Sequence, residues 1–189
     1  MKDAQFIASV RKLLAEYDRK VIGFVGDSHL AVPAWTTLLG IDTDNQAVSG
    51  ARLSEILLQV DQLADGIGLC FVMGGKNDID AGRSAVQIAA DQLAVCAKLK
   101  WRDIKPVLMT MFYVSSAYPN GAYINGVVNP VANYTYRPCI EAGYGWLNVV
   151  DSVCEGNVLL PQYTGDGCHL NADGIAQILS SMRSVLSST

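Results

Sequence analysis

The apolar residues of the chain fall into short continuous runs separated by longer stretches with helical periodicity. Apolar runs of about four to eight residues are typical of strands covered on both faces, as in parallel sheets. Polar residues interrupt the second of these runs, so we expect that strand to lie near an edge of the sheet. The runs predict about five strands, over residues 21–26, 41–48, 67–73, 106–112 and 146–150.

Between the runs, apolar side chains recur every three or four residues, which predicts amphipathic helices. The predicted helices cover residues 3–17, 33–39, 52–63, 84–100 and 171–186. In the last of them, Ile175, Ile178 and Met182 share one face, and Asp173 is a candidate N-terminal cap.

One long stretch, residues 113–137, fits neither pattern. It carries five tyrosines, among them Tyr113 and Tyr118, between glycine, asparagine and proline residues. We expect a long loop here, and a long loop in a compact domain is usually functional or disordered. Two interpretations stay open. The tyrosines pack beneath a surface loop, or their aromatic faces line the substrate pocket and stack on a sugar ring.

The alternation of strands and helices predicts an α/β fold with a parallel sheet and right-handed crossovers. Half of the 189 residues are hydrophobic and 17% are charged, a low share that suits a sheet buried on both sides. The length favours one domain with a sizeable core, and the sequence shows neither repeats nor a low-complexity linker. We therefore expect residues 1–189 to form a single domain.

Charge and composition narrow the range of partners. The net charge is −4 and no long basic run occurs, so we expect neither nucleic acid nor an anionic membrane surface as a partner. No apolar stretch approaches the ~20 residues that span a membrane. The first residues lack the apolar centre of a secretory signal, which leaves two locations open: the cytoplasm, or a larger or processed secreted protein.

The cysteines and histidines argue against a metal centre. Five cysteines occur without a CxxC pair, and the chain has two histidines, so we expect no metal site. Cys70 and Cys96 lie in apolar runs and are expected to pack in the core. A disulfide between Cys139 and Cys154 stays open as an alternative.

Residues that can carry chemistry follow several predicted strands, where open α/β sheets bind their ligands. Ser28 directly follows the first strand and is the candidate nucleophile, but a hydroxyl needs a base. His169 stands in a turn before the last helix and can be that base, with Asp166 three residues earlier to orient its ring. The backbone N–H groups of Ser28 and Gly50 and the amide of Asn77 are candidate oxyanion donors.

Four sequence blocks contain these residues: GDSH at 26–29, NQAVSG at 45–50, GKND at 75–78 and DGCHLNADG at 166–174. In order and spacing they resemble the blocks of the SGNH/GDSL hydrolases, and they span nearly the whole chain. The resemblance implies a three-layer α/β/α sandwich with a flavodoxin-like sheet. It also implies Ser28 as nucleophile, Gly50 and Asn77 in the oxyanion hole, and Asp166 with His169 to complete the triad.

The chain departs from the common form of these blocks at two positions, and neither is a catalytic group. His29 follows the serine, and Ala47 stands where the family often has glycine. We expect His29 to line the substrate pocket rather than to act as the base, because it adjoins Ser28 and has no orienting acid nearby in the sequence. No GxSxG sequence occurs, which argues against an ordinary α/β-hydrolase.

Other polar residues of the blocks have simpler interpretations. Asp27 and Asp78 are expected to bond the turns, and Cys168 to pack. Lys76 is expected to be solvated unless the substrate carries an anionic group. Ser28 itself has the alternative role of capping a helix.

Together the residues predict a serine esterase that works through an acyl-enzyme and needs no metal or organic cofactor. We expect a short acyl group, such as an O-acetyl ester on a carbohydrate, because no lid domain and no long apolar segment is present to cover a fatty chain. Two alternatives stay open. One is a lysophospholipase or thioesterase that takes longer acyl chains, and the other is a non-catalytic carbohydrate-binding domain on the same scaffold.

Overall fold

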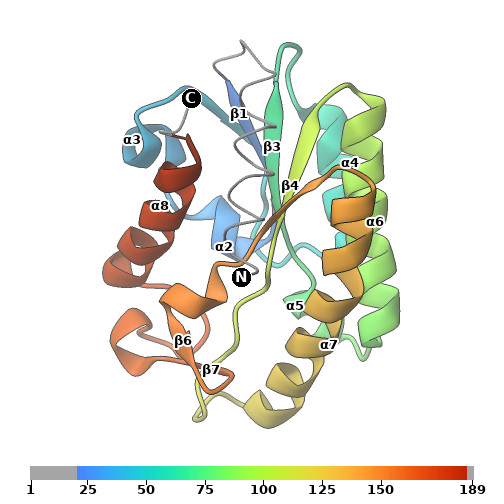
Figure 1. Cartoon of the computed structure of the whole chain (residues 1–189). Helices are drawn as coiled ribbons and strands as arrows, with labels where there is room; N and C mark the ends of the chain where they lie inside the picture. The colour runs from blue at the N-terminus through green and yellow to red at the C-terminus, as the bar shows by residue number, and fades with distance from the viewer. Residues whose placement is uncertain (1–20, 187–189) are drawn as a thin grey trace.

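Five parallel strands form the main sheet of the computed structural model, which describes residues 21–186 (Figure 1). They are ordered β2-β1-β3-β4-β5, the order of flavodoxin-like sheets. Every neighbouring pair is parallel, which confirms the predicted sheet and places β2 at an edge, as expected. The strands are Ile22–Gly26 (β1), Thr43–Asn45 (β2), Leu69–Met73 (β3), Lys105–Met109 (β4) and Gly145–Leu147 (β5).

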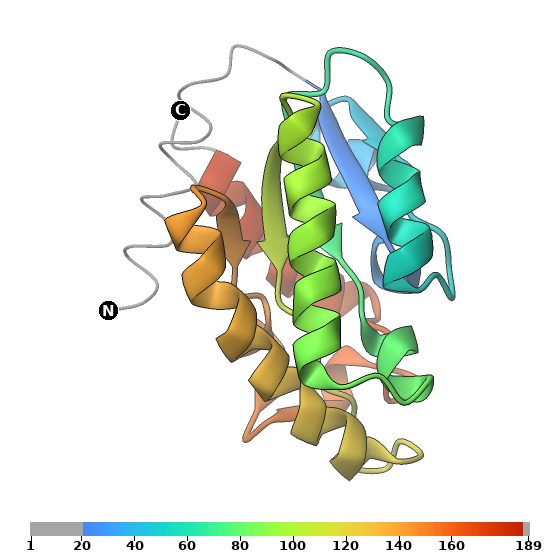
Figure 2. The same ribbon diagram turned by 90° about the vertical axis from the view of Figure 1, so that its right-hand side faces the viewer.

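Helices cover both faces of the sheet, which confirms the predicted α/β/α sandwich (Figures 1 and 2). One face carries α4 (Leu53–Gln62), α6 (Ala85–Trp101) and α7 (Gly121–Glu141). The other face carries α2 (Ser28–Ala31), α3 (Trp35–Leu39) and α8 (Ala172–Leu186). The shorter elements are α5 (Lys76–Asp80), η1 (Val150–Ser152), β6 (Cys154–Glu155), β7 (Val158–Leu159) and η2 (Pro161–Tyr163).

The core is centred on the middle strands, since every residue of β1, β3 and β4 is buried. Phe24 of β1 stacks on Trp35 of α3 with 4.9 Å between ring centroids, and it lies 5.4 Å from the ring of Phe71 in β3. Full burial of one such side chain contributes about 1.5–3 kcal/mol. This packing fixes the strand that leads into Ser28.

The helices predicted over 33–39, 52–63, 84–100 and 171–186 are present, whereas the one predicted over 3–17 lies outside the described residues. The expected cap of the last helix is wrong. Asn171, not Asp173, receives the hydrogen bond, because its Oδ1 accepts from the N–H of Gly174 at 3.0 Å. Asp173 lies in the first helical turn.

The long loop expected over residues 113–137 is also wrong, because most of it is helix α7. Pro130 and Pro138 lie inside the helix and free the carbonyls of Gly126 and Tyr134, but both of these residues are exposed, so water can hydrate the carbonyls. The face that packs on α6 has helical spacing that the prolines obscured in the sequence. That face is made of Ile124, Val128, Val131, Thr135 and Cys139.

The disulfide that the sequence left open is not formed. All five cysteines are free thiols, and Cys139 lies beside Cys96 rather than Cys154. Cys70 and Cys96 are buried in the core, as expected.

The strand order positions the functional site. The chain leaves β1 toward β2 on one side and returns to β3 on the other, so a crevice opens where the carboxyl ends of β1 and β3 lie together. Ligands of doubly wound folds bind at this point of reversal. Ser28 follows β1 directly, and α5 with Asn77 follows β3.

Candidate active site

The position of Ser28 is set by the buried end of β1. A Cβ at Gly26 would lie 2.4 Å from the Met73 carbonyl oxygen, so the two strands approach closely only because residue 26 is glycine. Asp27, which is 1% exposed, caps α2 by accepting from the N–H of His29 at 3.1 Å. The turn between strand and helix therefore points the Ser28 side chain out of the core.

A buried amide that the sequence did not flag holds the same strand end. The N–H of Gly26 donates to Gln59 Oε1 at 2.8 Å, and Gln59 Nε2 donates to the Gly26 carbonyl at 3.0 Å. Gln59 lies on the inner face of α4, between Ile56 and Val60. A glutamine on the apolar face of a predicted helix was the signal that could have identified it.

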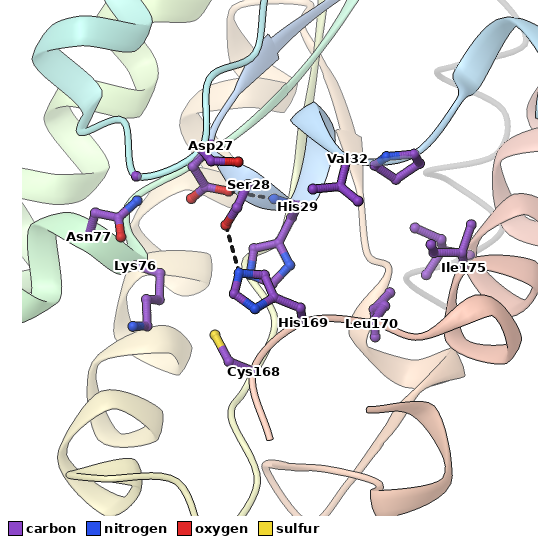
Figure 3. Close-up of a pocket in the computed structure, with 14 residues that line it drawn as sticks. Asp27, Ser28, His29, Val32, Lys76, Asn77, Cys168, His169, Leu170 and Ile175 are labelled. Atoms are coloured by element: carbon purple, nitrogen blue, oxygen red, sulfur yellow. Dashed lines mark hydrogen bonds between the residues drawn. The ribbon is translucent and has the colours of Figure 1, made fainter. Parts of the chain in front are cut away.

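The three predicted triad residues form one hydrogen-bonded series, of which Figure 3 shows the Ser28–His169 pair. Ser28 Oγ lies 2.9 Å from His169 Nε2, and His169 Nδ1 lies 2.6 Å from Asp166 Oδ2. The series is open to solvent, since the side chains of His169 and Asp166 are 48% and 56% exposed. This geometry suits proton transfer between a serine hydroxyl and an oriented imidazole.

Asp166 also organises the loop that carries the histidine. Its Oδ1 accepts from the backbone N–H groups of Cys168 at 2.8 Å and His169 at 2.7 Å. Thr164 Oγ1 accepts from the N–H of Gly167 at 2.9 Å. Desolvation alone raises the pKa of Asp166, but the hydrogen bonds from the His169 ring and the two N–H groups outweigh it and hold that pKa well below its usual range.

Asn77 follows β3 on the short helix α5. The preceding Gly75 has φ +126°, and a Cβ there would lie 2.6 Å from Met111 Sδ, so the turn requires glycine. Asn77 Nδ2 donates to the Ala51 carbonyl at 2.9 Å, which ties α5 to the loop that contains Gly50. An amide nitrogen has two N–H groups, so the second stays available to a ligand.

Asp78, the next residue, serves the scaffold. It is buried, its Oδ2 accepts from the N–H of Leu53 at 3.0 Å, and its Oδ1 lies 3.7 Å from Arg83 Nε. It thereby fixes the start of α4 against α5, as the sequence suggested.

No protein-family model and no curated protein matches the sequence. The structure is similar to a GDSL-like lipase from Bacteroides thetaiotaomicron, with a TM-score of 0.73, 17% identity, and 97% of this chain and 100% of that one covered. The psychrotrophic esterase EstA from Pseudoalteromonas sp. gives a TM-score of 0.67 at 16% identity and 89% and 97% coverage. A catalytic mutant of an acetylxylan esterase from Geobacillus stearothermophilus gives 0.70 at 12% identity and 88% and 94% coverage.

The chain has the SGNH/GDSL hydrolase fold. Its predicted nucleophile, base and two oxyanion residues all line one cavity of about 500 Å³. Figure 3 shows Lys76 and Asn77 on one side of the Ser28–His169 pair and apolar side chains on the opposite side. The apolar side is formed by Val32, Pro33, Leu170, Ile175 and Ile178.

His29 lines the same cavity in this SGNH/GDSL fold. Its ring lies 5.1 Å from the ring of Phe112, edge to face, and 5.3 Å from the His169 ring. Desolvation lowers the pKa of His29 despite the opposing effect of Asp27, so the ring is neutral near pH 7. A neutral ring without a hydrogen bond to Ser28 fits a pocket wall better than a second base.

Lys76 is the cation of the cavity wall. Its Nζ donates to Asp80 Oδ2 at 2.6 Å and to the Tyr118 hydroxyl at 3.0 Å. Partial burial lowers its pKa, but these two partners outweigh burial and leave the pKa raised. Lys76 is thus a half-buried, charged wall residue rather than the solvated side chain that the sequence suggested.

The three residues expected to form the substrate pocket separate in the structure. His29 lines the cavity of Ser28. Tyr118 does not line this cavity, but its hydroxyl accepts a hydrogen bond from Lys76, which does. Tyr113 is not brought to this cavity and lines a second one instead. It belongs to the segment after β4, in which Phe112 contacts His29 while Met111 and Tyr113 line the second cavity.

Cys168 lines the cavity beside His169 but is buried. Desolvation raises the pKa of its thiol, which disfavours the nucleophilic thiolate and agrees with a packing role. Within residues 21–186 no cluster of three or more metal-ligating side chains occurs. Among the described helices, none is long and apolar enough to cross a membrane.

Proposed function

We propose that the chain is a carboxylic ester hydrolase in which Ser28 is the nucleophile. The observation that carries the proposal is the hydrogen-bonded series Ser28–His169–Asp166 at a cavity that also contains Gly50 and Asn77. Solved structures of the same fold include proteins described as esterases and lipases, which supports the same reaction class.

The reaction proceeds through an acyl-enzyme. Ser28 Oγ attacks the ester carbonyl carbon while His169 Nε2 takes the hydroxyl proton. The bond between the carbonyl carbon and the alcohol oxygen then breaks, and the imidazolium donates its proton to the departing alkoxide. Water attacks the acyl-enzyme with His169 as base, which releases the acid and restores Ser28. Asp166 stays ionised throughout and stabilises the imidazolium.

The negative charge that develops on the carbonyl oxygen is held by three donors. They are the backbone N–H groups of Ser28 and Gly50 and the free N–H of the Asn77 amide. One such donor contributes about 3–4 kcal/mol to the transition state. Asn77 is held in place for this role by its bond to the Ala51 carbonyl.

The first candidate substrate is a short acyl ester, an O-acetyl group in particular, on a carbohydrate. The exposed Asp166 and His169 side chains support it, because a site that is open to solvent around His169 admits a bulky alcohol such as a sugar. One solved structure of the same fold is an acetylxylan esterase, at 12% identity.

The second candidate is an ester or thioester with a longer acyl chain, as in a lysophospholipase or thioesterase. The apolar side of the cavity favours it, since Val32, Leu170 and Ile175 offer a chain an apolar surface next to Ser28. Each buried methylene would contribute about 0.8 kcal/mol to binding.

A chromogenic acetyl ester tests the reaction. We expect wild type to hydrolyse 4-nitrophenyl acetate and Ser28→Ala to lower kcat by about 10⁶-fold while its circular dichroism stays unchanged. Ser54→Ala, an exposed serine of α4 outside the cavity, is the matched control and keeps wild-type kinetics. Equal rates in wild type and Ser28→Ala would exclude the mechanism and favour a non-catalytic binding domain.

The chain-length dependence of kcat/KM separates the two candidates. Fastest turnover of the acetyl ester in a series of acetyl, butyryl and octanoyl 4-nitrophenyl esters supports the first. Faster turnover of the octanoyl ester supports the second, and Ile175→Asp should then remove that preference.

A further inference from the structure

The second cavity, of about 550 Å³, lies at the carboxyl ends of β4 and β5. Its walls come from α7, from the segment between β5 and β6, and from the β6–β7 hairpin. It shares no lining residue with the cavity of Ser28. It is at least as large as the catalytic cavity, so it can hold a ligand of its own.

Aromatic side chains form one part of this second cavity. Tyr113, Tyr136 and Trp146 line it, and the rings of Tyr136 and Trp146 meet edge to face with 4.9 Å between centroids. Tyr113 and Trp146 are 5% and 9% exposed, so Tyr136 is the most accessible of the three rings. Aromatic rings pack against the apolar C–H faces of other rings, including sugar rings.

Asparagine side chains form another part of the lining. Asn148 Oδ1 accepts from the N–H of Val150 at 3.1 Å, and Asn148 Nδ2 donates to Asp151 Oδ2 at 2.8 Å, so this wall is fixed. Asn129, Asn133 and Asn157 are exposed, and within the described residues their side chains make no hydrogen bond. Each amide can therefore both donate to and accept from a ligand.

The charge of the lining restricts the ligand class. The side chains that line this cavity in the described chain include no lysine, arginine or histidine, and Asp151 is the acidic residue among them. Phosphorylated and carboxylated ligands are bound through cations, so they are disfavoured here. The asparagine amides and aromatic rings of this cavity instead match a neutral ligand that has many hydroxyl groups and apolar ring faces.

We propose that the cavity of Tyr113, Asn133 and Trp146 binds a neutral saccharide. One segment of the chain lies between the cavity and the site of Ser28. Met111 and Tyr113 line the saccharide cavity, whereas Phe112 between them contacts His29 of the catalytic cavity. A saccharide held here lies next to the site where an ester is cleaved. Binding itself is independent of catalysis, but the use of this cavity for an acylated saccharide rests on the proposed function.

Binding of unacylated oligosaccharides to the full chain tests the proposal. The probes are xylotetraose, cellotetraose and chitotetraose, with tetragalacturonate as the anionic comparison, titrated by calorimetry and by tryptophan fluorescence. We expect at least one neutral tetrasaccharide to bind and tetragalacturonate not to bind. Asn129→Ala and Asn133→Ala should each raise the Kd about fivefold to tenfold, the effect of one lost hydrogen bond.

Tyr134→Ala is the control, because Tyr134 is exposed on the same helix and does not line the cavity. It should bind like wild type, as should Ser28→Ala. No binding of any neutral probe would overturn the proposal, and so would equal affinity in the asparagine variants or equal binding of tetragalacturonate. Binding that is lost in Ser28→Ala would place the saccharide in the catalytic cavity instead and overturn this site. Saccharide binding without esterase activity would reject only the proposed function.

Discussion

Two aspartates lie next to the proposed nucleophile and base, in opposite surroundings. Asp27 is 1% exposed at the end of β1, and desolvation raises the pKa of its carboxyl despite nearby positive groups. Asp166 is 56% exposed on a loop, and hydrogen bonds from His169 and Cys168 hold the pKa of its carboxyl low. The buried carboxylate is thus the less stable anion of the two, and the exposed one is the more stable.

The difference shows that Ser28 and His169 are positioned by different means. Ser28 follows a buried strand end that Gln59 holds from 33 positions away, and Asp27 caps the short helix that Ser28 begins. His169 is held mainly by local hydrogen bonds to Asp166, which accepts from both its ring and its backbone N–H. Substitutions at the strand end should therefore change stability, whereas substitutions in the loop should change activity.

The largest expected effect is on catalysis, at Asp166. Asp166→Asn leaves the shape of the side chain unchanged but removes the charge that orients and stabilises the His169 imidazolium. We expect kcat toward 4-nitrophenyl acetate to fall about 10⁴-fold. Asp173→Asn, an exposed residue at the start of α8, is the matched control and keeps the wild-type rate. A loss of less than tenfold in Asp166→Asn would mean that the loop aspartate is not the orienting acid.

The next effect is on stability, at Gln59. Gln59→Leu leaves the buried N–H of Gly26 without a partner, while the Gly26 carbonyl keeps its bond from the Val48 N–H, so we expect the free energy of unfolding to fall by about 1–3 kcal/mol. Urea denaturation measures this loss. Gln62→Leu, at the exposed end of the same helix, should change it by less than about 0.5 kcal/mol. If the two variants were equally stable, the strand end would not depend on this amide.

The smallest expected effects are changes in the free energy of unfolding with pH, and they have opposite signs for the two aspartates. Because the pKa of Asp166 is lowered by folding, its contribution to stability is present above the ordinary value of about 3.9 and is lost as the pH falls. Because the pKa of Asp27 is raised, its contribution is present at acid pH and is lost as the pH rises through the raised value. Near pH 7, Asp27 therefore costs stability while Asp166 adds to it.

Urea denaturation across pH tests these signs. At pH 7 we expect Asp27→Asn to be about 1 kcal/mol more stable than wild type, since the amide can still accept from the His29 N–H without a buried charge. Asp166→Asn should be less stable by under about 1 kcal/mol, because solvent screens this exposed carboxylate. Both differences should shrink toward acid pH. If both variants were more stable than wild type at pH 7, or both less stable, the proposed difference between Asp27 and Asp166 would be contradicted.

The sequence predicted the sheet because the sheet depends on a simple local signal, whereas the grouping of Ser28, Asp166 and His169 came from four blocks that resemble those of the SGNH/GDSL hydrolases. Buried parallel strands are continuous apolar runs, and the residues that follow them meet at one edge of the sheet. The structure brings the three residues into a hydrogen-bonded series, but their catalytic roles stay predictions until the variants are measured.

The features that were missed depend on contacts between distant parts of the chain. Gln59 resembles any polar residue of a helix until its partner Gly26, 33 positions away, is known. Helix α7 contains two prolines, and its packing on α6 outweighs their low helix propensity. The direction of Tyr113 depends on where β4 ends, and a shift of one residue in an extended segment turns a side chain to the opposite side.

Ser28 and His169 are 141 positions apart, and this separation has a consequence for synthesis of the chain. A chain grows from its N-terminus, so Ser28 leaves the ribosome long before its base is made. If Ser28 acts as proposed, it has no base until the last part of the chain is made, and the growing chain is inactive as an esterase. Under the proposed mechanism, hydrolysis requires that the loop of Asp166 has docked beside Ser28, so the onset of activity would report this docking.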